Sequence, residues 1–340
     1  MSSSTHPLVL LGQPLLDISV SVSNEELSQF GLKANDMVLA SDCHAALFSA
    51  VETREDAWFL AGGSAQNSAR GAQWLLPADS VAFVGCVGND AAKETLERVA
   101  AKDGLTADFL VHQTLPTGKC AVLITGNNRS MVTDLQASQQ LDLHKLKTRW
   151  ERVENARIFY CTAYLLKDSF DAVLAVAQHA TNNNKTFCFN LAAPWIPSVF
   201  PNELEQAIYY ADYLFGNESE ARAYAEANKL SATSIDGIAL HMSTLPKSPT
   251  SFLKSRIVVI TQGPDPIIIA TNGQLLTHPV PKVSDIVDTN GAGDAFCGGF
   301  LAGLVEQRDL NECLEKAVFV ANTVLKQQGA SYPPKATSNI

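Results

Sequence analysis

Short runs of apolar residues alternate with amphipathic helical patterns along most of this 340-residue chain. The hydrophobicity of each run is continuous, as expected for a strand that is buried on both faces of a sheet. The predicted strands are 8–11, 81–87, 158–161, 186–190, 213–215 and 257–261. The predicted helices, with apolar residues three and four positions apart, are 64–76, 91–102, 169–180, 218–227 and 292–304. This alternation predicts an α/β fold with a mostly parallel central sheet that helices cover.

Two segments, 17–22 and 120–125, break this rhythm because apolar and polar residues alternate in them. The second segment is followed by Gly126-Asn127-Asn128 and then by 131–135, which predicts a β-hairpin with one solvated face. Together with 58–61, these segments predict a small second sheet that lies over a cleft as a lid. Residues from Tyr332 onward are predicted to form a frayed tail.

The formal net charge of −10, from 35 acidic and 25 basic residues, argues against a nucleic-acid partner held by a basic surface. No apolar stretch approaches about 18 residues, and residues 1–7 lack a positive signal-peptide region, so neither membrane insertion nor secretion is expected. The seven cysteines form no C-x-x-C motif, and several lie in apolar runs, as buried thiols do in a reducing compartment. The expected location is the cytoplasm, with the nucleus also compatible.

The most informative segment is Asp288-Thr289-Asn290-Gly291-Ala292-Gly293-Asp294, which an apolar helix follows directly. Gly291 and Gly293 allow close backbone approach, and N–H groups at such a helix start form an anion-binding nest that the helix dipole strengthens. Asp294 then lies in the first helical turn, beside the anion. The same pattern also fits a well-capped helix in which Asp294 only complements the dipole.

Two other phosphate-binding motifs are absent from the sequence. A dinucleotide fingerprint requires glycine three residues after Gly293, where this chain has Phe296. A Walker A loop requires serine or threonine after Gly118-Lys119, where this chain has Cys120. The chain is therefore not predicted to be an oxidoreductase on a dinucleotide-binding fold.

Smaller polar signals each allow a structural and a functional interpretation. The segment Ala61-Gly62-Gly63-Ser64-Ala65-Gln66-Asn67 forms either a tight turn into a helix or a backbone surface for a polar ligand. Asp17 either caps a turn or binds a diol through both carboxylate oxygens. Asn217 and Glu220 either cap a helix or reach the water shell of Mg²⁺. Arg129, at the hairpin turn, is either exposed or a clamp that closes on a phosphate.

Taken in order, these segments resemble the ribokinase-type carbohydrate and nucleoside kinases, and within them the branch that phosphorylates adenosine. The glycine-rich segments mark the superfamily, whereas the P-L-L-D, A-Q-W and N-R-S pieces are typical of the adenosine branch. The resemblance runs through nearly the whole chain, over 12–17, 61–68, 72–74, 116–118, 124–126, 128–130, 190–191, 193–194, 216–218, 261–263 and 288–294.

The resemblance implies a three-layer α/β/α ribokinase-like fold with a small, discontinuous β-sheet lid. The lid is expected to comprise 17–63 and 116–137, and the large domain 1–16, 64–115 and 138–340. The implied reaction transfers the γ-phosphoryl group of ATP to the 5′-hydroxyl of adenosine, giving AMP and ADP in purine salvage, with Mg²⁺ as cofactor. The expected partners are the small molecules adenosine and ATP, and the expected state is a monomer.

Site residues are carried over by motif. Asp294 would be the base, Gly291, Ala292 and Gly293 the anion hole, and Arg129 the lid residue that closes onto the phosphates. In a loose transition state the hydroxyl proton leaves late, so this base is expected to need no raised pKa. The expected nucleoside contacts are Asp17, Gln13, Leu15, Leu39, Gly62, Gly63, Ser64, Asn67, Met131, Leu165 and Trp195. The expected nucleotide contacts are Asn190, Asn217, Glu220, Thr261, Gly263, Asn290, Gly291 and Gly293, with Glu220 also reaching the metal through water.

The chain departs from the family pattern around the expected nucleoside. Gln13 stands where asparagine is usual, and Trp195 replaces the phenylalanine that commonly packs on the base, with Ala192 in place of a serine. Tyr164 and Leu165 replace a usual phenylalanine pair. An indole still stacks on a purine, so the expected reaction class is unchanged.

Two alternative functions follow from the same residues. A sugar kinase of this fold would phosphorylate ribose or fructose, but apolar lid residues such as Leu15, Leu16, Leu39 and Met131 favour a flat base. A nucleoside-binding regulator would have lost catalysis, and an intact Asp294 disfavours this alternative.

Overall fold

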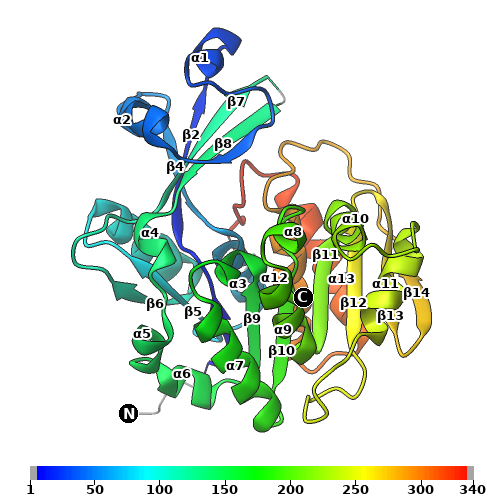
Figure 1. The fold of residues 1–340 in the computed structure, drawn as a ribbon. Helices are drawn as coiled ribbons and strands as arrows, with labels where there is room; N and C mark the ends of the chain where they lie inside the picture. Colours follow the sequence, from blue (N-terminus) through cyan, green and yellow to red (C-terminus); the bar gives the residue numbers. More distant parts are fainter. Residues whose placement is uncertain (1–5, 127, 335–340) are drawn as a thin grey trace.

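The computed structural model describes residues 6–126 and 128–334, and every structural statement below refers to these residues. Its main feature is a nine-stranded sheet at the centre of the larger body (Figure 1). The order across this sheet is β14 (Gln274–His278), β13 (Asp265–Thr271), β12 (Ile257–Gln262), β11 (Tyr213–Asn217), β10 (Thr186–Asn190), β9 (Ile158–Thr162), β1 (Leu8–Leu11), β5 (Val81–Val87) and β6 (Thr106–Val111). The pairs from β12 to β6 are parallel, whereas β13 and β14 pair antiparallel at one edge.

Helices cover both faces of this sheet, which gives the three predicted layers. Strand β1 shows why, because its four side chains are fully buried and alternate between two cores. Leu8 and Leu10 belong to one core together with residues of α3 (Ser64–Leu75), α12 (Ala292–Val305) and α13 (Leu310–Val324). Val9 and Leu11 belong to the other core together with residues of α7 (Phe170–Asn182), α9 (Pro201–Tyr210) and α11 (Ile235–Thr244). This period-two alternation buries both faces of the strand. The α/β/α fold and all six predicted strands are confirmed.

The helices that were predicted from periodicity form within two residues of their expected bounds, and several others were not predicted. The described α-helices are α1 (Asn24–Gln29), α2 (Ala45–Glu52), α3 (Ser64–Leu75), α4 (Ala91–Asp103), α5 (Leu143–Lys147), α6 (Trp150–Asn155), α7 (Phe170–Asn182), α8 (Ile196–Val199), α9 (Pro201–Tyr210), α10 (Glu218–Ala227), α11 (Ile235–Thr244), α12 (Ala292–Val305) and α13 (Leu310–Val324). Short 3₁₀ turns are η1 (Asp42–His44), η2 (Gln136–Gln139) and η3 (Ala163–Leu166). Among the described residues, no helix combines the length and the hydrophobicity that a membrane crossing needs.

A second sheet of five strands stands at one end of the large sheet, with α1 and α2 beside it (Figure 1). Its order is β3 (Met37–Leu39), β8 (Asn128–Asp134), β7 (Lys119–Thr125), β2 (Leu15–Ser21) and β4 (Trp58–Gly62). The predicted hairpin is confirmed, since β7 and β8 pair antiparallel with Thr125 opposite Asn128. Asn127 of the predicted turn lies outside the described residues. Strand β2 begins at Leu15, two residues before the predicted lid segment.

Helices α3 and α12 pack very closely, and this contact fixes the positions of the side chains at their N-terminal ends. Gly298 makes the approach possible, because a Cβ at this position would lie 2.6 Å from the backbone oxygen of Ser68. Phe296 and Phe300 of α12 lie in the same core as Ala65 and Ala69 of α3. The first turns of both helices are therefore held side by side.

The prediction of a frayed tail from Tyr332 onward was wrong for the part that the structure describes. The Tyr332 hydroxyl donates to the backbone oxygen of Asn67 at 2.9 Å, and Trp74 Nε1 donates to the backbone oxygen of Pro333 at 2.8 Å. Trp74 also stacks on Phe319 of α13, with ring centroids 5.7 Å apart. Aromatic packing on two helices therefore orders a segment whose polar sequence indicates a tail. Residues 335–340 of the predicted tail lie outside the described residues.

All seven cysteines lie within the described residues and are free thiols, six of them buried. The interior also contains a fully buried arginine, Arg256, whose pKa burial lowers to about 10. Its guanidinium stays charged at neutral pH and donates to backbone oxygens at the C-terminal ends of α9 and α11, those of Ile208, Met242, Leu245 and Pro246. Carbonyl groups at helix C-termini attract a cation.

Arg256→Met should lower the free energy of unfolding by at least about 3 kcal/mol, because it leaves several buried carbonyl groups without a donor. Urea unfolding followed by circular dichroism measures this change. Arg222→Met is the matched control, since Arg222 is half exposed and pairs with Glu218 on the surface. Its free energy of unfolding should stay within about 0.5 kcal/mol of the parent. Equal effects of the two substitutions would contradict the structural role of Arg256.

Candidate active site

A cavity of about 560 Å³ lies where the parallel strands of the large sheet end and the five-stranded sheet begins. Thr162, Asn190, Asn217 and Thr261 line it from the carboxyl ends of β9, β10, β11 and β12. Ligands of open α/β sheets bind at these strand ends. The other walls come from α3, from the start of α12 and from the five-stranded sheet.

Most residues predicted for the site line this one cavity, although many are far apart in the chain. The predicted residues on its wall are Gln13, Leu15, Asp17, Leu39, Gly63, Ser64, Asn67, Met131, Asn190, Trp195, Asn217, Glu220, Thr261, Asn290, Gly291, Gly293 and Asp294. Among the described residues, five predicted ones lie outside the cavity lining, namely Gly62, Arg129, Leu165, Gly263 and Ala292.

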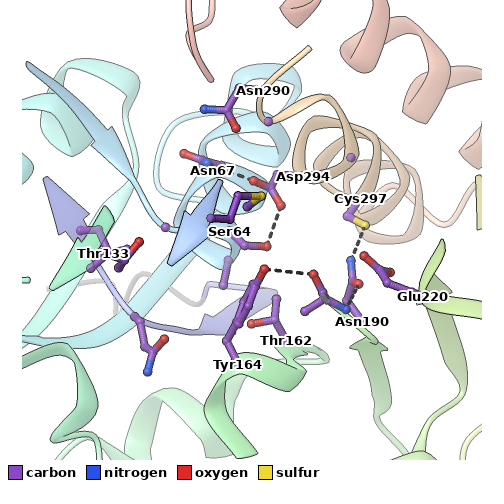
Figure 2. Close-up of a pocket in the computed structure, with 18 of the residues that line it drawn as sticks. Ser64, Asn67, Thr133, Thr162, Tyr164, Asn190, Glu220, Asn290, Asp294 and Cys297 are labelled. Carbon is purple, nitrogen blue, oxygen red and sulfur yellow. Dashed lines mark hydrogen bonds between the residues drawn. The ribbon is translucent and has the colours of Figure 1, made fainter. Parts of the chain in front are cut away.

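Asp294 lies in the first turn of α12. This helix begins directly after Gly291, whose φ of 76° is left-handed. Its carboxylate accepts hydrogen bonds from Ser64 Oγ at 2.6 Å and from Asn67 Nδ2 at 3.0 Å (Figure 2). Burial raises the pKa of Asp294 from 3.8 to about 6, although the two hydrogen bonds act in the opposite direction. The reaction was expected to need no raised pKa at this base, and burial in the cavity nevertheless raises it.

The backbone before Asp294 forms an open helix start that faces the cavity. Gly291 and Gly293 lie on the cavity wall, and within the described chain no side chain caps α12. The backbone N–H groups of a first helical turn have no partner inside the helix, and the helix dipole adds partial positive charge there. Ala292 lies off the wall, and its backbone N–H donates to the backbone oxygen of Thr289 at 3.3 Å. This geometry suits an anion such as a phosphate.

Asp288 holds this loop in shape and connects it to the five-stranded sheet. Its side chain is buried and accepts the backbone N–H of Asn290 at 3.0 Å. Arg129 of β8 donates its Nε to the same carboxylate at 2.9 Å. Arg129 therefore does not sit exposed in a turn, and it is not on the cavity wall. It crosses from the small sheet to the loop that begins α12.

Asp17 lies on the cavity wall in β2, with Gly62 of the neighbouring strand β4 against it. A Cβ at Gly62 would lie 2.1 Å from Asp17 Oδ1, so only glycine leaves room for the carboxylate. The pKa of Asp17 is raised from 3.8 to about 7, mainly by burial and also by the negative charge of Asp294, whereas Arg70 acts in the opposite direction. Gly62 therefore supports Asp17 from behind rather than lining the cavity.

Aromatic side chains form another part of the cavity wall, and the composition of this part differs from the prediction. Trp195 lies on the wall and is 45% exposed, and its ring is 6.3 Å from that of Tyr164. The Tyr164 hydroxyl donates to the backbone oxygen of Ala192 at 3.0 Å, which fixes the ring (Figure 2). Leu165 is fully buried in the core instead, because successive residues of the η3 turn point in different directions.

Another part of the cavity wall, around Glu220 and Asn217, is polar. Glu220 is buried there and forms a capping box with Asn217, whose backbone N–H and side-chain amide donate to the carboxylate. Burial raises the pKa of Glu220 to about 7, the hydrogen bond from the Asn217 backbone lowers it, and the charge of Asp294 raises it. Capping and lining the cavity are thus compatible roles for these two residues. Gly263 is not part of the cavity lining and lies in the exposed turn between β12 and β13.

The structure adds wall residues that the sequence reasoning did not assign to the site. Tyr164, Met37, Val38, Thr133, Lys167 and Cys297 all line the cavity. Figure 2 shows Cys297 one turn after Asp294, within 3.3 Å of Asn190 Nδ2. Its position three residues after Asp294 was the available signal, since such residues share one helix face. Met37 and Val38 had no such signal, because the short strand β3 was not predicted.

Comparison with known proteins agrees with this geometry. The sequence profile of the pfkB family carbohydrate kinases matches residues 24–337. An adenosine kinase of Saccharomyces cerevisiae is 39% identical over 340 residues, which cover 98% of this chain and 99% of that protein.

Two solved structures are similar over almost the whole fold. Adenosine kinase of Anopheles gambiae, in complex with P1,P4-di(adenosine-5) tetraphosphate, is 35% identical with a TM-score of 0.89 over 97% of each chain. Adenosine kinase of Schistosoma mansoni, in complex with adenosine and AMP, is 30% identical with a TM-score of 0.90 over 99% of this chain and 100% of that one. With the profile match and the identity to relatives over the full length, these similarities show that the chain belongs to the pfkB family of carbohydrate kinases, in its adenosine kinase branch.

Proposed function

We propose that this chain transfers the γ-phosphoryl group of ATP to the 5′-hydroxyl of adenosine, giving AMP and ADP. The observation that carries this proposal is the position of Asp294. Its carboxylate lies in the first turn of α12, directly after an open anion-binding helix start, and two hydrogen bonds from α3 orient it. A base and an anion site thus adjoin each other in one cavity, as phosphoryl transfer to a hydroxyl requires.

Asp294 acts as the general base. With a pKa of about 6 it is mostly ionised at neutral pH, and it is more basic than an ordinary aspartate. Both properties favour proton acceptance from the attacking hydroxyl. Ser64 and Asn67 keep the carboxylate oriented, so that little reorganisation precedes the transfer.

The N–H groups at the start of α12 stabilise the negative charge on the transferred group. Arg129 adds a positive charge from the small sheet, and its bond to Asp288 fixes the side chain near this loop. We propose that the small sheet, with 17–63 and 116–137, closes over the cavity as a lid. Closure would exclude water and so protect ATP from hydrolysis.

The apolar and aromatic wall selects a nucleoside over a bare sugar. Trp195 and Tyr164 offer a surface on which a purine stacks, and Leu39 and Met131 add apolar lining from strands β3 and β8 of the small sheet. Asp17 is the residue that we assign to the ribose hydroxyls, with Gly63 and Asn67 beside it. A carboxylate accepts two hydroxyl donors at once, which suits a diol.

Magnesium fits this site as an ion that arrives with ATP. Within the described residues no cluster of three or more histidine, cysteine, aspartate or glutamate side chains is placed to hold a metal directly. Mg²⁺ retains several waters and binds phosphates readily, and Glu220 is the carboxylate that would accept a hydrogen bond from such a water. When bound, the ion would neutralise charge on the phosphates.

We further propose that the enzyme acts as a monomer in the cytoplasm, with the nucleus as a compatible location. The free, mostly buried thiols support a reducing compartment.

A coupled assay of ADP release tests the proposed reaction. The purified chain, with ATP and Mg²⁺, is compared on adenosine, guanosine, inosine, ribose and fructose. Adenosine should give the highest kcat/KM, by at least about 10²-fold over the two sugars, because a sugar has no base to stack on Trp195 and Tyr164. A preference for ribose or fructose would show a sugar kinase. Adenosine binding without ADP release would show a regulator.

Asp294→Asn should lower kcat by at least about 10²-fold, because the amide cannot accept the hydroxyl proton. Steady-state kinetics at saturating ATP measure this loss, and thermal unfolding checks that the variant is folded. Asp285→Asn, in the exposed loop before the anion-binding segment, is the matched control and should keep the parent kcat. Near-parental turnover of Asp294→Asn would remove this residue from the mechanism.

The pH profile should show the same carboxylate. The pKa of Asp294 is raised to about 6, and only its ionised form accepts a proton, so kcat/KM should fall about tenfold per pH unit well below pH 6. Asp17 also has a raised pKa, so Asp17→Asn distinguishes the two groups. This variant should have a lower kcat/KM at every pH. It should retain the fall of kcat/KM below pH 6, which is the acid limb of the profile. Loss of the limb in Asp17→Asn would assign it to Asp17 instead.

A further inference from the structure

The segment 329–333, which we name the C-terminal strap, contacts both α3 and the loop that precedes α12. Its first contact is with α3. The Tyr332 hydroxyl donates at 2.9 Å to the backbone oxygen of Asn67, the residue whose side chain holds Asp294. This bond joins residues that are 265 positions apart in the chain. The strap therefore touches the helix turn that orients the base.

Arg70 and Trp74 of α3 hold the strap in place. The Arg70 guanidinium lies 5.4 Å from the centre of the Tyr332 ring and donates to the backbone oxygen of Ala330 at 2.8 Å. Trp74 Nε1 donates to the backbone oxygen of Pro333 at 2.8 Å. Arg70 is itself buried and paired with Asp103, so its position is fixed. A cation over an aromatic ring adds to these hydrogen bonds.

The other end of the strap meets the anion-binding loop. The backbone N–H of Gly329 donates to Asp288 Oδ2 at 3.1 Å, the same oxygen that Arg129 contacts. Ala330 packs against Gly291, where a Cβ would lie 2.5 Å from the Ala330 Cβ. One short segment thus contacts the loop that receives the phosphate and the helix that orients the base.

We propose that the C-terminal strap sets the position of the anion-binding loop relative to Ser64 and Asn67, and that Tyr332 is a positioning residue for the phosphoryl transfer. This inference rests on the proposed function of Asp294. Without the strap, α3 and the loop remain connected mainly through the α3–α12 contact. The distance between the base and the phosphate site then becomes less well defined, and such displacements reduce the rate of a positioned reaction.

The hydroxyl of Tyr332 is the part that a purely space-filling role does not need. Phenylalanine would fill the same volume and pack equally well on Trp74 and Arg70. The hydroxyl adds a directional bond to the Asn67 turn, and Gly71 provides the space for it, because a Cβ there would lie 2.8 Å from the hydroxyl oxygen. Two different substitutions therefore disturb the same bond, one from each side.

The test compares Tyr332→Phe, Gly71→Ala and the double variant in the full-length chain, with Ser331→Ala as control. The Ser331 hydroxyl donates to the backbone oxygen of Gln328 and is exposed, so its loss should change nothing. Tyr332→Phe should lower kcat about 3- to 10-fold, with both KM values unchanged. Gly71→Ala should give a similar loss because it displaces the hydroxyl. The double variant should lose no more than either single one, because both remove one interaction.

The pH profile separates positioning from simple stability. The bonds from Ser64 and Asn67 lower the pKa of Asp294, so looser bonds should raise it. The acid limb of kcat/KM in Tyr332→Phe should therefore move to higher pH, while that of Ser331→Ala stays in place. A parental kcat and pH profile in Tyr332→Phe, with only a lower Tm, would overturn the proposal. Failure of the parent chain to phosphorylate adenosine would instead refute the proposed function.

Discussion

The hydrogen bonds that Asp294 receives from Ser64 and Asn67 are the interaction on which the rest of the site depends. They join the first turns of α3 and α12. Ser64 is 230 positions and Asn67 is 227 positions from Asp294 in the chain. Their lengths require α3 and α12 to approach closely, and a helix with a side chain at Gly298 could not do so. Gly298 is therefore explained by the approach of α12 to α3, whereas Gly299 and Gly303 allow α13 to approach on another side.

The buried carboxyl groups of this molecule have two different kinds of surroundings. The cavity raises the pKa of Asp17, Glu220 and Asp294, so three neighbouring carboxyl groups are poorly solvated before any ligand binds. Under the proposed function, ribose hydroxyls and the waters of a magnesium ion would supply further donors to these groups. The buried Asp288, in contrast, is fully engaged by the protein and links β8, the anion-binding loop and the C-terminal strap. The carboxyl groups on the cavity wall are thus distinct from the one that connects these segments.

The buried strands could be predicted from the sequence because each apolar run is continuous, and a run such as 81–87 has no polar interruption that would blur its ends. The motif around Asp294 was also visible, since its glycines and aspartate lie within one short segment. The pairing of Arg129 with Asp288 was not, because it depends on a lid strand and a loop that are 159 residues apart. Leu165 was assigned to the cavity by analogy with a phenylalanine pair, but the η3 turn directs its side chain into the core. Strand β3 is too short for its alternation to be recognised, and Tyr332 looked like part of a tail because its partners are on α3.

Helix α12 also has a consequence for biosynthesis. The helix that carries Asp294 packs on α3 and α13, so one wall of the cavity is made from residues that the ribosome adds after β1, β5 and β9. A nascent polypeptide that has already formed β1, β5 and β9 still lacks that wall. Activity can therefore appear only after α12 has been synthesised and has packed on α3.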